Sequence, residues 1–126
     1  IDYLRNFAKS AIYSTALPPV VLAGNLKALE IIEKDKKLGK KALTNAIYFC
    51  ALLGLDQPKS TIVPIIIGNA LRTLEIAKTI SDQGFLISAI RPPTVEANKS
   101  RLRITFSALH KKSDIKKLAQ IIRTYP

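Results

Sequence analysis

The sequence holds one cysteine, no tryptophan and no long apolar run, and each shortage excludes a class of protein. Because Cys50 has no second cysteine to pair with, an internal disulfide and a thiolate zinc site are excluded. Cys50 lies in an apolar stretch, where a small buried hydrophobe is expected. No stretch is long enough to cross a bilayer, and the first residues lack the pattern of a signal peptide. We therefore expect no membrane association and a cytoplasmic location.

Motifs for catalysis are also missing. There is no glycine-rich phosphate loop, no cluster of metal-ligating residues and no nucleophile beside a partnered base, and the carboxylates are scattered. His110 is the single histidine, and nothing near it in the sequence would orient its ring. A surface or turn position is therefore favoured over a catalytic one. The residues taken alone predict neither a metal site nor a catalytic centre.

The charge balance is strongly basic, with 20 Lys and Arg residues against 9 Asp and Glu residues and a formal net charge of +11. Such a field can attract nucleic acid, an anionic membrane or an acidic protein. The four Tyr and four Phe residues do not interleave with the basic residues as a base-stacking surface requires. A solvated lysine-rich surface is the favoured interpretation, and no nucleic-acid partner is predicted.

Residues 1–55 have the pattern of consecutive helices. Apolar side chains predict a helix over residues 2–11, which ends before Pro18 and Pro19 because proline pushes the preceding residue into an extended conformation. Pro19 suits the first turn of a second helix. A third helix is expected over about residues 35–53, with Gly54 as its stop. These residues are interpreted as a helical lead-in.

From residue 56 onward, the pattern alternates between strands and helices. Strands are predicted over residues 61–67, where Pro64 favours an edge position or a bulge, and over residues 85–90 and 102–108. The helix expected over residues 70–82 would turn four residues toward the core: Leu71, Leu74, Ala77 and Ile80. Ser113 is a good N-cap for a last helix. The order β-α-β-β-α predicts an α+β domain over residues 56–126, a small mainly antiparallel sheet covered by helices.

A stiff corner and the strand after it carry the clearest binding chemistry. Alternation puts Arg101, Arg103 and Thr105 on one face of the strand and apolar side chains on the other. A guanidinium matches a carboxylate through two parallel hydrogen bonds, so arginines beside the corner Arg91-Pro92-Pro93-Thr94 suit a carboxylate ligand. A polar face that only meets water is the alternative, and alternation does not choose between Arg101 and Arg103.

Ser14 and Thr15 place two hydroxyls ahead of the helix that begins at Pro19. Hydroxyls at such a place can bind a phosphate together with backbone N–H groups. Capping of the following helix is the simpler alternative.

Three stretches together resemble the C-terminal part of the α-oxoamine synthases, pyridoxal-phosphate (PLP) enzymes of the aspartate-aminotransferase fold. They are residues 13–19, 89–95 and 101–110, in the order and at the spacing of that family. The Arg-Pro-Pro-Thr form at residues 91–94 is that of the branch which makes 8-amino-7-oxononanoate. The resemblance implies an α/β PLP-transferase fold. Residues 1–55 would then come from the end of the large PLP-binding domain, and residues 56–126 would form the C-terminal small domain.

The resemblance also implies a reaction and its partners. Enzymes of this branch are homodimeric acyltransferases that use pyridoxal 5'-phosphate. They condense L-alanine with pimeloyl-CoA or pimeloyl-acyl carrier protein and release CO2, in biotin biosynthesis.

By the same resemblance, site roles fall on particular residues. Arg103 matches the arginine that binds the amino-acid carboxylate, and Thr94 matches a substrate-contacting threonine. Arg91 is expected near the substrate channel, and Arg101 is expected to be structural or solvated. Ser14 and Thr15 match hydroxyls that reach the cofactor phosphate of the neighbouring subunit.

One departure from the family limits what this chain does alone. The Schiff-base lysine of the family lies upstream of the matching segment, and no lysine here stands in its context, so the chain alone is expected to be an inactive fragment. Residues 96–100 also depart from the family's Pro- and Gly-containing loop. Two alternatives stay open. The chain could be a segment of a sister synthase making 2-amino-3-oxobutyrate or 5-aminolevulinate, or a non-catalytic remnant that binds an acidic partner such as acyl carrier protein.

Overall fold

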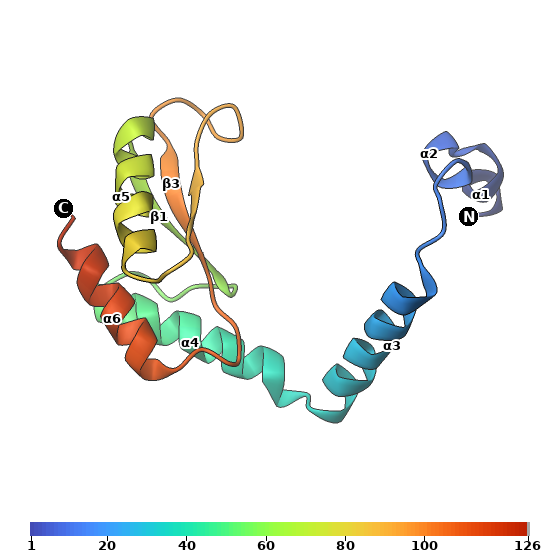
Figure 1. Cartoon of the computed structure of the whole chain (residues 1–126), viewed down its shortest axis with the longest axis horizontal. Coiled ribbons are helices and arrows are strands. Elements are labelled where there is room, and N and C mark those ends of the chain that lie inside the picture. The colour runs from blue at the N-terminus through green and yellow to red at the C-terminus, as the bar shows by residue number, and fades with distance from the viewer. Residues whose placement is uncertain (126) are drawn as a thin grey trace. The chain divides into compact units, whose positions relative to one another are not determined.

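Three helices form the first of two units into which the chain divides, residues 1–36; the second unit begins at Lys37. The structure is a computed structural model and describes residues 1–125. The helices are α1 (Asp2–Phe7), α2 (Lys9–Ile12) and α3 (Pro19–Lys34), labelled in Figure 1. The extended backbone of Ala8 divides the predicted helix 2–11 into α1 and α2, and Pro19 starts α3 as predicted.

The apolar side chains of the first unit have little cover within it. No residue from 1 to 36 is buried. The stripe on α3 consists of Leu22, Leu26, Leu29 and Ile32, and each of these is more than half exposed. The helices of this unit therefore gain little stability from packing among themselves.

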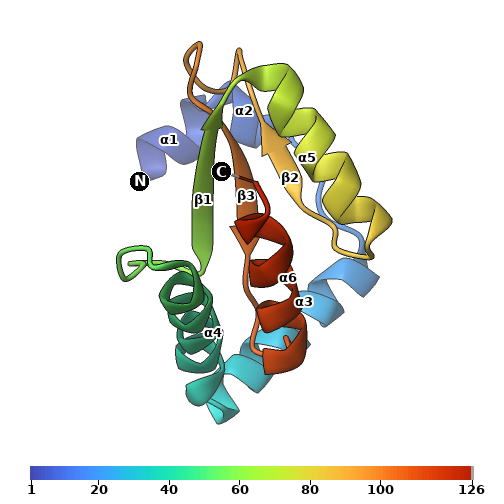
Figure 2. The same ribbon diagram turned by 90° about the vertical axis from the view of Figure 1, so that its left-hand side faces the viewer.

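The second unit contains one sheet and three helices. These are α4 (Lys37–Leu53), β1 (Ile62–Gly68), α5 (Ala70–Asp82), β2 (Ser88–Ile90), β3 (Ser100–Thr105) and α6 (Lys112–Arg123). The strand order is β1-β3-β2 and both pairings are antiparallel. Helices α5 and α6 cover one face of the sheet (Figures 1 and 2). The predicted α+β class is confirmed, and Pro64 lies in an edge strand as expected.

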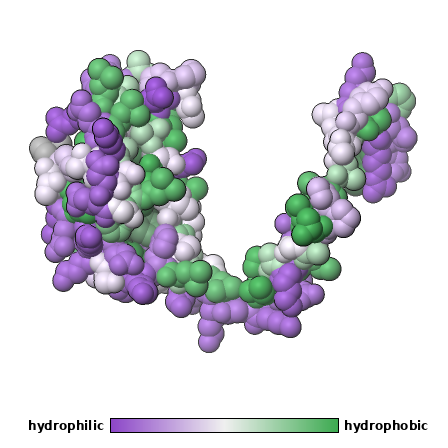
Figure 3. All heavy atoms as spheres, viewed as in Figure 1, coloured by the Kyte–Doolittle hydropathy of each residue, from purple (hydrophilic) through white to green (hydrophobic). Residues whose placement is uncertain are grey.

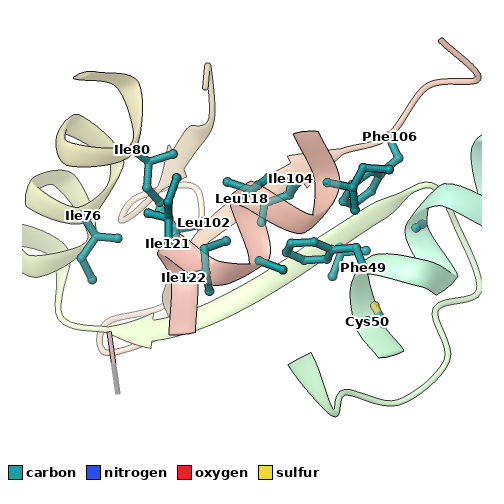
Figure 4. Packing of buried hydrophobic residues seen from close by; sticks show 14 residues of the cluster. Phe49, Cys50, Ile76, Ile80, Leu102, Ile104, Phe106, Leu118, Ile121 and Ile122 are labelled. Atoms are coloured by element: carbon teal, nitrogen blue, oxygen red, sulfur yellow. The ribbon is translucent and has the colours of Figure 1, made fainter. Parts of the chain in front are cut away.

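The core lies between the sheet and its helices, with β3 at its centre (Figure 4). Leu102, Ile104 and Phe106 are all at most 4% exposed, as the alternation predicted. Phe106 packs against Phe49 of α4 with ring centroids 5.0 Å apart. Cys50 is buried beside this pair, and burial raises the pKa of its thiol.

Glycines end two helices of this unit. Gly54 follows α4 with φ +69°, and Gly84 follows the end of α5 with φ +89°, a region that favours glycine. The N–H of Leu55 donates to the carbonyl of Cys50 at 3.0 Å, which closes the last turn of α4. The predicted stop at Gly54 is confirmed.

Among residues 1–125, no helix combines the length and the apolarity needed to span a membrane.

Two local predictions are wrong. Lys111, not Ser113, is the N-cap residue of α6, and the Ser113 hydroxyl donates to the Asp114 carboxylate at 3.3 Å. In α5 the prediction is wrong for Leu71 and Leu74, which are 72% and 38% exposed, and Thr73 and Ile76 are buried instead. It is confirmed for Ile80, which is buried, and for Ala77, which packs partly buried against the core. Thr73 can be buried because its hydroxyl donates to the Asn69 carbonyl at 2.6 Å.

The second unit begins at Lys37 because α4 packs on α6 and β1. The predicted domain boundary after residue 55 followed the change of sequence pattern instead. The assignment of residues 1–55 to the end of a large PLP-binding domain stays a prediction.

Candidate functional site

Arg103 lies at the centre of the sheet face that α5 and α6 leave open. It sits on the middle strand, opposite Pro64 of β1 on one side and Ser88 of β2 on the other. Arg103, Pro64 and Ser88 are all exposed, whereas Leu102 and Ile104 on either side of Arg103 are buried. The pairing therefore places one small hydroxyl, that of Ser88, next to Arg103 on this face.

Arg101 lies on the same face, one row away, between Ile66 and Ile90. Successive residues of one strand face are about 7 Å apart, so Arg101 and Arg103 can contact one ligand or two neighbouring ones. Arg101 is half-buried, and its Nε donates to the Lys99 carbonyl at 3.0 Å. This contact within its own loop agrees with the structural role expected for Arg101, and it leaves Arg103 as the arginine presented to solvent.

The corner that begins at Arg91 directly follows β2. The N–H of Thr94 donates to the Arg91 carbonyl at 3.1 Å, which closes a turn around the two prolines. Both Arg91 and Thr94 are exposed. The loop therefore returns the chain to Arg101 with the Arg91–Thr94 turn at the same end of the sheet as the arginine row.

A hollow of about 450 Å³ opens beside this corner. It is lined by residues of the loop and of β3: Pro93, Thr94, Val95, Glu96, Lys99 and Arg101. Lys99 and Glu96 form an ion pair at 2.5 Å, and Asn98 between them takes a left-handed conformation with φ +61°. Thr94 and Arg101 thus share one hollow, while Arg91 and Arg103 do not line it.

Nothing in the sequence indicated Lys99 and Glu96 as lining residues. Their positions depend on the path of the loop, which no periodic pattern in the sequence predicts. Pro64 and Ser88, the neighbours of Arg103, were also missed, because the register between strands is not readable from one sequence. Of the features around Arg103, only the alternation along β3 could be predicted from the sequence.

Ser14 and Thr15 lie in the first unit, in the segment between α2 and α3. Both are exposed, and the Ser14 hydroxyl donates to the Ala11 carbonyl at 2.7 Å. Since that proton is already engaged, Ser14 must turn its hydroxyl to donate to a phosphate. Pro18, the N-cap residue of α3, has no side-chain hydrogen bond, so neither hydroxyl caps that helix.

His110 holds a turn together. Its Nδ1 accepts a hydrogen bond from the Ser107 N–H at 3.2 Å, and its ring stands edge-on to Phe106. Asn45 of α4 donates to the carbonyls of both Ser107 and His110, at 2.9 and 3.2 Å. This environment gives His110 the turn position that the sequence favoured.

The described residues do not form an enclosed PLP site. Every lysine among them is exposed, so none offers the shielded amine that an aldimine requires. Ser14 and Thr15 do not line the hollow beside Thr94. The chain presents two exposed hydroxyls that suit a phosphate and an arginine row that suits a carboxylate.

The sequence model of "Aminotransferase class I and II" matches residues 1–122. The chain belongs to this family. Among its relatives is the 8-amino-7-oxononanoate synthase of Methylocella silvestris, 46% identical over 98% of this chain and 35% of the relative. That of Maricaulis maris is 45% identical over 98% of this chain and 31% of the relative. The chain thus spans about a third of the length of these relatives, and the predicted resemblance is confirmed.

Solved structures of the family agree with the fold. The 8-amino-7-oxononanoate synthase of Francisella tularensis matches with a TM-score of 0.77 and 26% identity, over 98% of this chain and 37% of that one. A serine palmitoyltransferase from S. paucimobilis, which holds a PLP–myriocin aldimine, matches with a TM-score of 0.86 and 19% identity. That match covers 98% of this chain and 33% of the other. The predicted PLP-transferase fold is confirmed.

Proposed function

We propose that this chain is the C-terminal segment of a PLP-dependent 8-amino-7-oxononanoate synthase. The longer enzyme condenses L-alanine with a pimeloyl thioester and releases CO2, as a homodimeric acyltransferase in the cytoplasm. The observation that carries the proposal is the position of Arg103, exposed on the open face of the central strand, in a chain similar to these synthases over nearly its whole length.

In this proposal Arg103 binds the carboxylate of L-alanine. A permanently charged planar guanidinium offers two parallel hydrogen bonds, which fix the orientation of the amino acid as well as its position. The rigid pairing of β3 with both neighbouring strands supports that orientation. Arg91 and Thr94 contact the acyl donor from the adjoining corner.

Ser14 and Thr15 contribute hydroxyls to the cofactor phosphate of the neighbouring subunit. PLP supplies an electron sink when it is bound, and the protein supplies orientation and charge. The residues that would enclose the cofactor, above all its lysine, are not offered by this chain. The 126-residue chain by itself is therefore expected to be inactive.

A donor comparison tests this function. The longer protein, encoded together with the coding sequence upstream of residue 1, is offered pimeloyl-, succinyl- and acetyl-CoA with L-alanine and with glycine. Turnover is expected with pimeloyl-CoA and L-alanine, and none is expected from the 126-residue chain alone. Turnover only with succinyl- or acetyl-CoA and glycine would instead assign the chain to a sister synthase.

A further inference from the structure

The hollow beside Thr94 carries an excess of positive charge. Among the residues that line it, Lys99 and Arg101 are cationic and Glu96 is anionic. One positive charge is left after these are balanced, which suits a ligand that brings one carboxylate. Residues 96–100 depart from the loop of the family, so the resemblance assigns no role to Lys99.

The backbone holds Lys99 in a defined place. Its N–H donates to the Glu96 carbonyl at 3.1 Å, and Asn98 inside this turn has φ +61°. Gly68 pairs with Ser100 at the end of β1, and a Cβ added to Gly68 would lie 3.3 Å from the Asn98 carbonyl oxygen. The loop therefore passes close to the sheet, and the Lys99 side chain starts from a closed turn at the beginning of β3.

The ion pair with Glu96 leaves the Lys99 ammonium accessible to a ligand. The side chains of Lys99 and Glu96 are 58% and 76% exposed, and an ion pair that meets water in this way contributes little. An ammonium has three N–H donors, so it can keep one carboxylate and bind a second one. Arg101 stays beside it, because the Arg101 Nε donates to the Lys99 carbonyl.

Apolar side chains lie between Arg103 and this hollow. Arg101 is one row away from Arg103 on the open face of the sheet, and the strand pairing places it between Ile66 and Ile90. Ile66 is 57% exposed and Ile90 is half-buried. Figure 3 shows hydrophobic and hydrophilic side chains side by side over the upper end of this unit, where the loop between β2 and β3 lies. An aliphatic chain along this row would contact both isoleucines and end at the loop.

The acyl donor of the proposed function has the length to cover this row. Its thioester carbon must approach the α-carbon of L-alanine, whose carboxylate is bound at Arg103. Six C–C bonds of about 1.5 Å each, in an extended zigzag, place the remote carboxylate of a pimeloyl chain about 7 to 8 Å from the thioester carbon. Rows on one strand face are about 7 Å apart, so this carboxylate reaches the hollow. A succinyl chain has half as many bonds, and an acetyl group has no second carboxylate.

We propose that Lys99 binds the remote carboxylate of a dicarboxylic acyl donor, with Ile66 and Ile90 on either side of its methylene chain. The inference rests on the proposed function and adds to it the residues that select the donor. Lys99 pairs with the carboxylate through charge-assisted hydrogen bonds, and the isoleucines shield the methylene groups from water. A donor of equal length without the second carboxylate forgoes these hydrogen bonds, so the subsite favours the dicarboxylic chain.

Lys99→Gln tests the subsite in the longer protein, with Lys59→Gln as the matched control. Lys59 is exposed and precedes β1, at the opposite end of the sheet from Lys99. Lys99→Gln should raise the KM for pimeloyl-CoA about tenfold and keep kcat within about twofold, because the lost contact is made equally before and during the reaction. Lys59→Gln should leave both constants within about twofold. An unchanged KM for L-alanine in both variants shows that the site around Arg103 is intact.

Inhibition by free acids measures the same contact without turnover. Pimelate and heptanoate have equal chain lengths and differ by one carboxylate. In competition with pimeloyl-CoA, pimelate should inhibit the wild-type protein about tenfold more strongly than heptanoate does. In Lys99→Gln the two acids should inhibit equally.

The outcomes separate this subsite from the proposed function. Turnover of pimeloyl-CoA with the same KM in the wild type and in Lys99→Gln would overturn the subsite and leave the function standing. An equal rise of the KM in Lys99→Gln and Lys59→Gln would also overturn the subsite, because it would indicate only an effect of net charge. The absence of pimeloyl-CoA turnover in the wild type would overturn the proposed function, and the subsite with it.

Discussion

Asn45 joins two segments that are far apart in the chain. Its side-chain amide is 4% exposed and donates to the carbonyls of Ser107 and His110, so α4 is fixed to the turn that precedes α6. His110 holds the same turn from the other side through its Nδ1. The sequence indicated a turn position for His110, but no local pattern pairs an asparagine with a turn more than sixty residues later.

Replacement of Asn45 by alanine should destabilise the second unit. Asn45→Ala removes the donor of two carbonyls, and the free energy of unfolding should fall by about 2 kcal/mol. Urea unfolding followed by circular dichroism measures the change. Thr44→Ala is the matched control, because its exposed hydroxyl bonds only to the Lys40 carbonyl of its own helix. It should stay within about 0.5 kcal/mol of the wild type, and equal losses in the two variants would refute the role of Asn45.

The central strand β3 shows how far a sequence pattern can be interpreted. Its alternation predicted the buried face and the arginine face correctly, because a strand covered on one side leaves a period of two in the sequence. The same kind of reasoning failed for α5, where Leu71 and Leu74 were expected inside. The apolar side chains of α5 are compatible with two overlapping stripes along the helix. Thr73 lies on the buried stripe although it is polar, because its hydroxyl is satisfied by its own backbone.

The expected boundary of α6 failed for a different reason. Ser113 is a good N-cap by residue type, but the N-cap residue is Lys111, directly after the turn that joins Ser107 to His110. The residue types predicted the helix, whereas its first residue depends on the turn that precedes it. The hollow beside Thr94 could not be predicted from a local pattern either, because the residues that line it depend on the path of a loop.

Two leucine-to-alanine substitutions test the account of the sheet. Leu102 is fully buried at the centre of β3, so Leu102→Ala should lower the free energy of unfolding by about 3 kcal/mol through lost burial and the cavity left behind. Leu86 is 97% exposed, and Leu86→Ala should change the free energy of unfolding by less than about 0.5 kcal/mol. Denaturant unfolding measures both. A small loss at Leu102 would mean that the sheet does not pack as described.

The two units of the chain differ in how their helices are stabilised. The second unit has a continuous core from Phe49 to Ile122, whereas no side chain of residues 1–36 is buried. Exposed helices without tertiary packing are marginal in water, even at the length of α3. The apolar stripe of α3 is therefore a surface that the helices of its own unit leave uncovered.

Hydrogen exchange should report this difference directly. In the 126-residue chain, the amides of α1 to α3 should exchange far faster than those of β3 and α6, because local opening is easiest where few apolar contacts hold an element. In the longer protein, the amides of α3 should become protected. Strong protection of α3 in the 126-residue chain would contradict this account.

The central claim is that Arg103 binds the carboxylate of L-alanine in a synthase of which this chain is the C-terminal segment. The most direct test is the KM for L-alanine in the longer protein, compared between Arg103→Lys and the matched control Arg101→Lys. A lysine keeps the charge and loses the planar fork, so Arg103→Lys should raise that KM at least about tenfold. Arg101→Lys should leave it within about twofold, because Arg101 is engaged by its own loop. An unchanged KM in Arg103→Lys, or an equal rise in both variants, would contradict the claim.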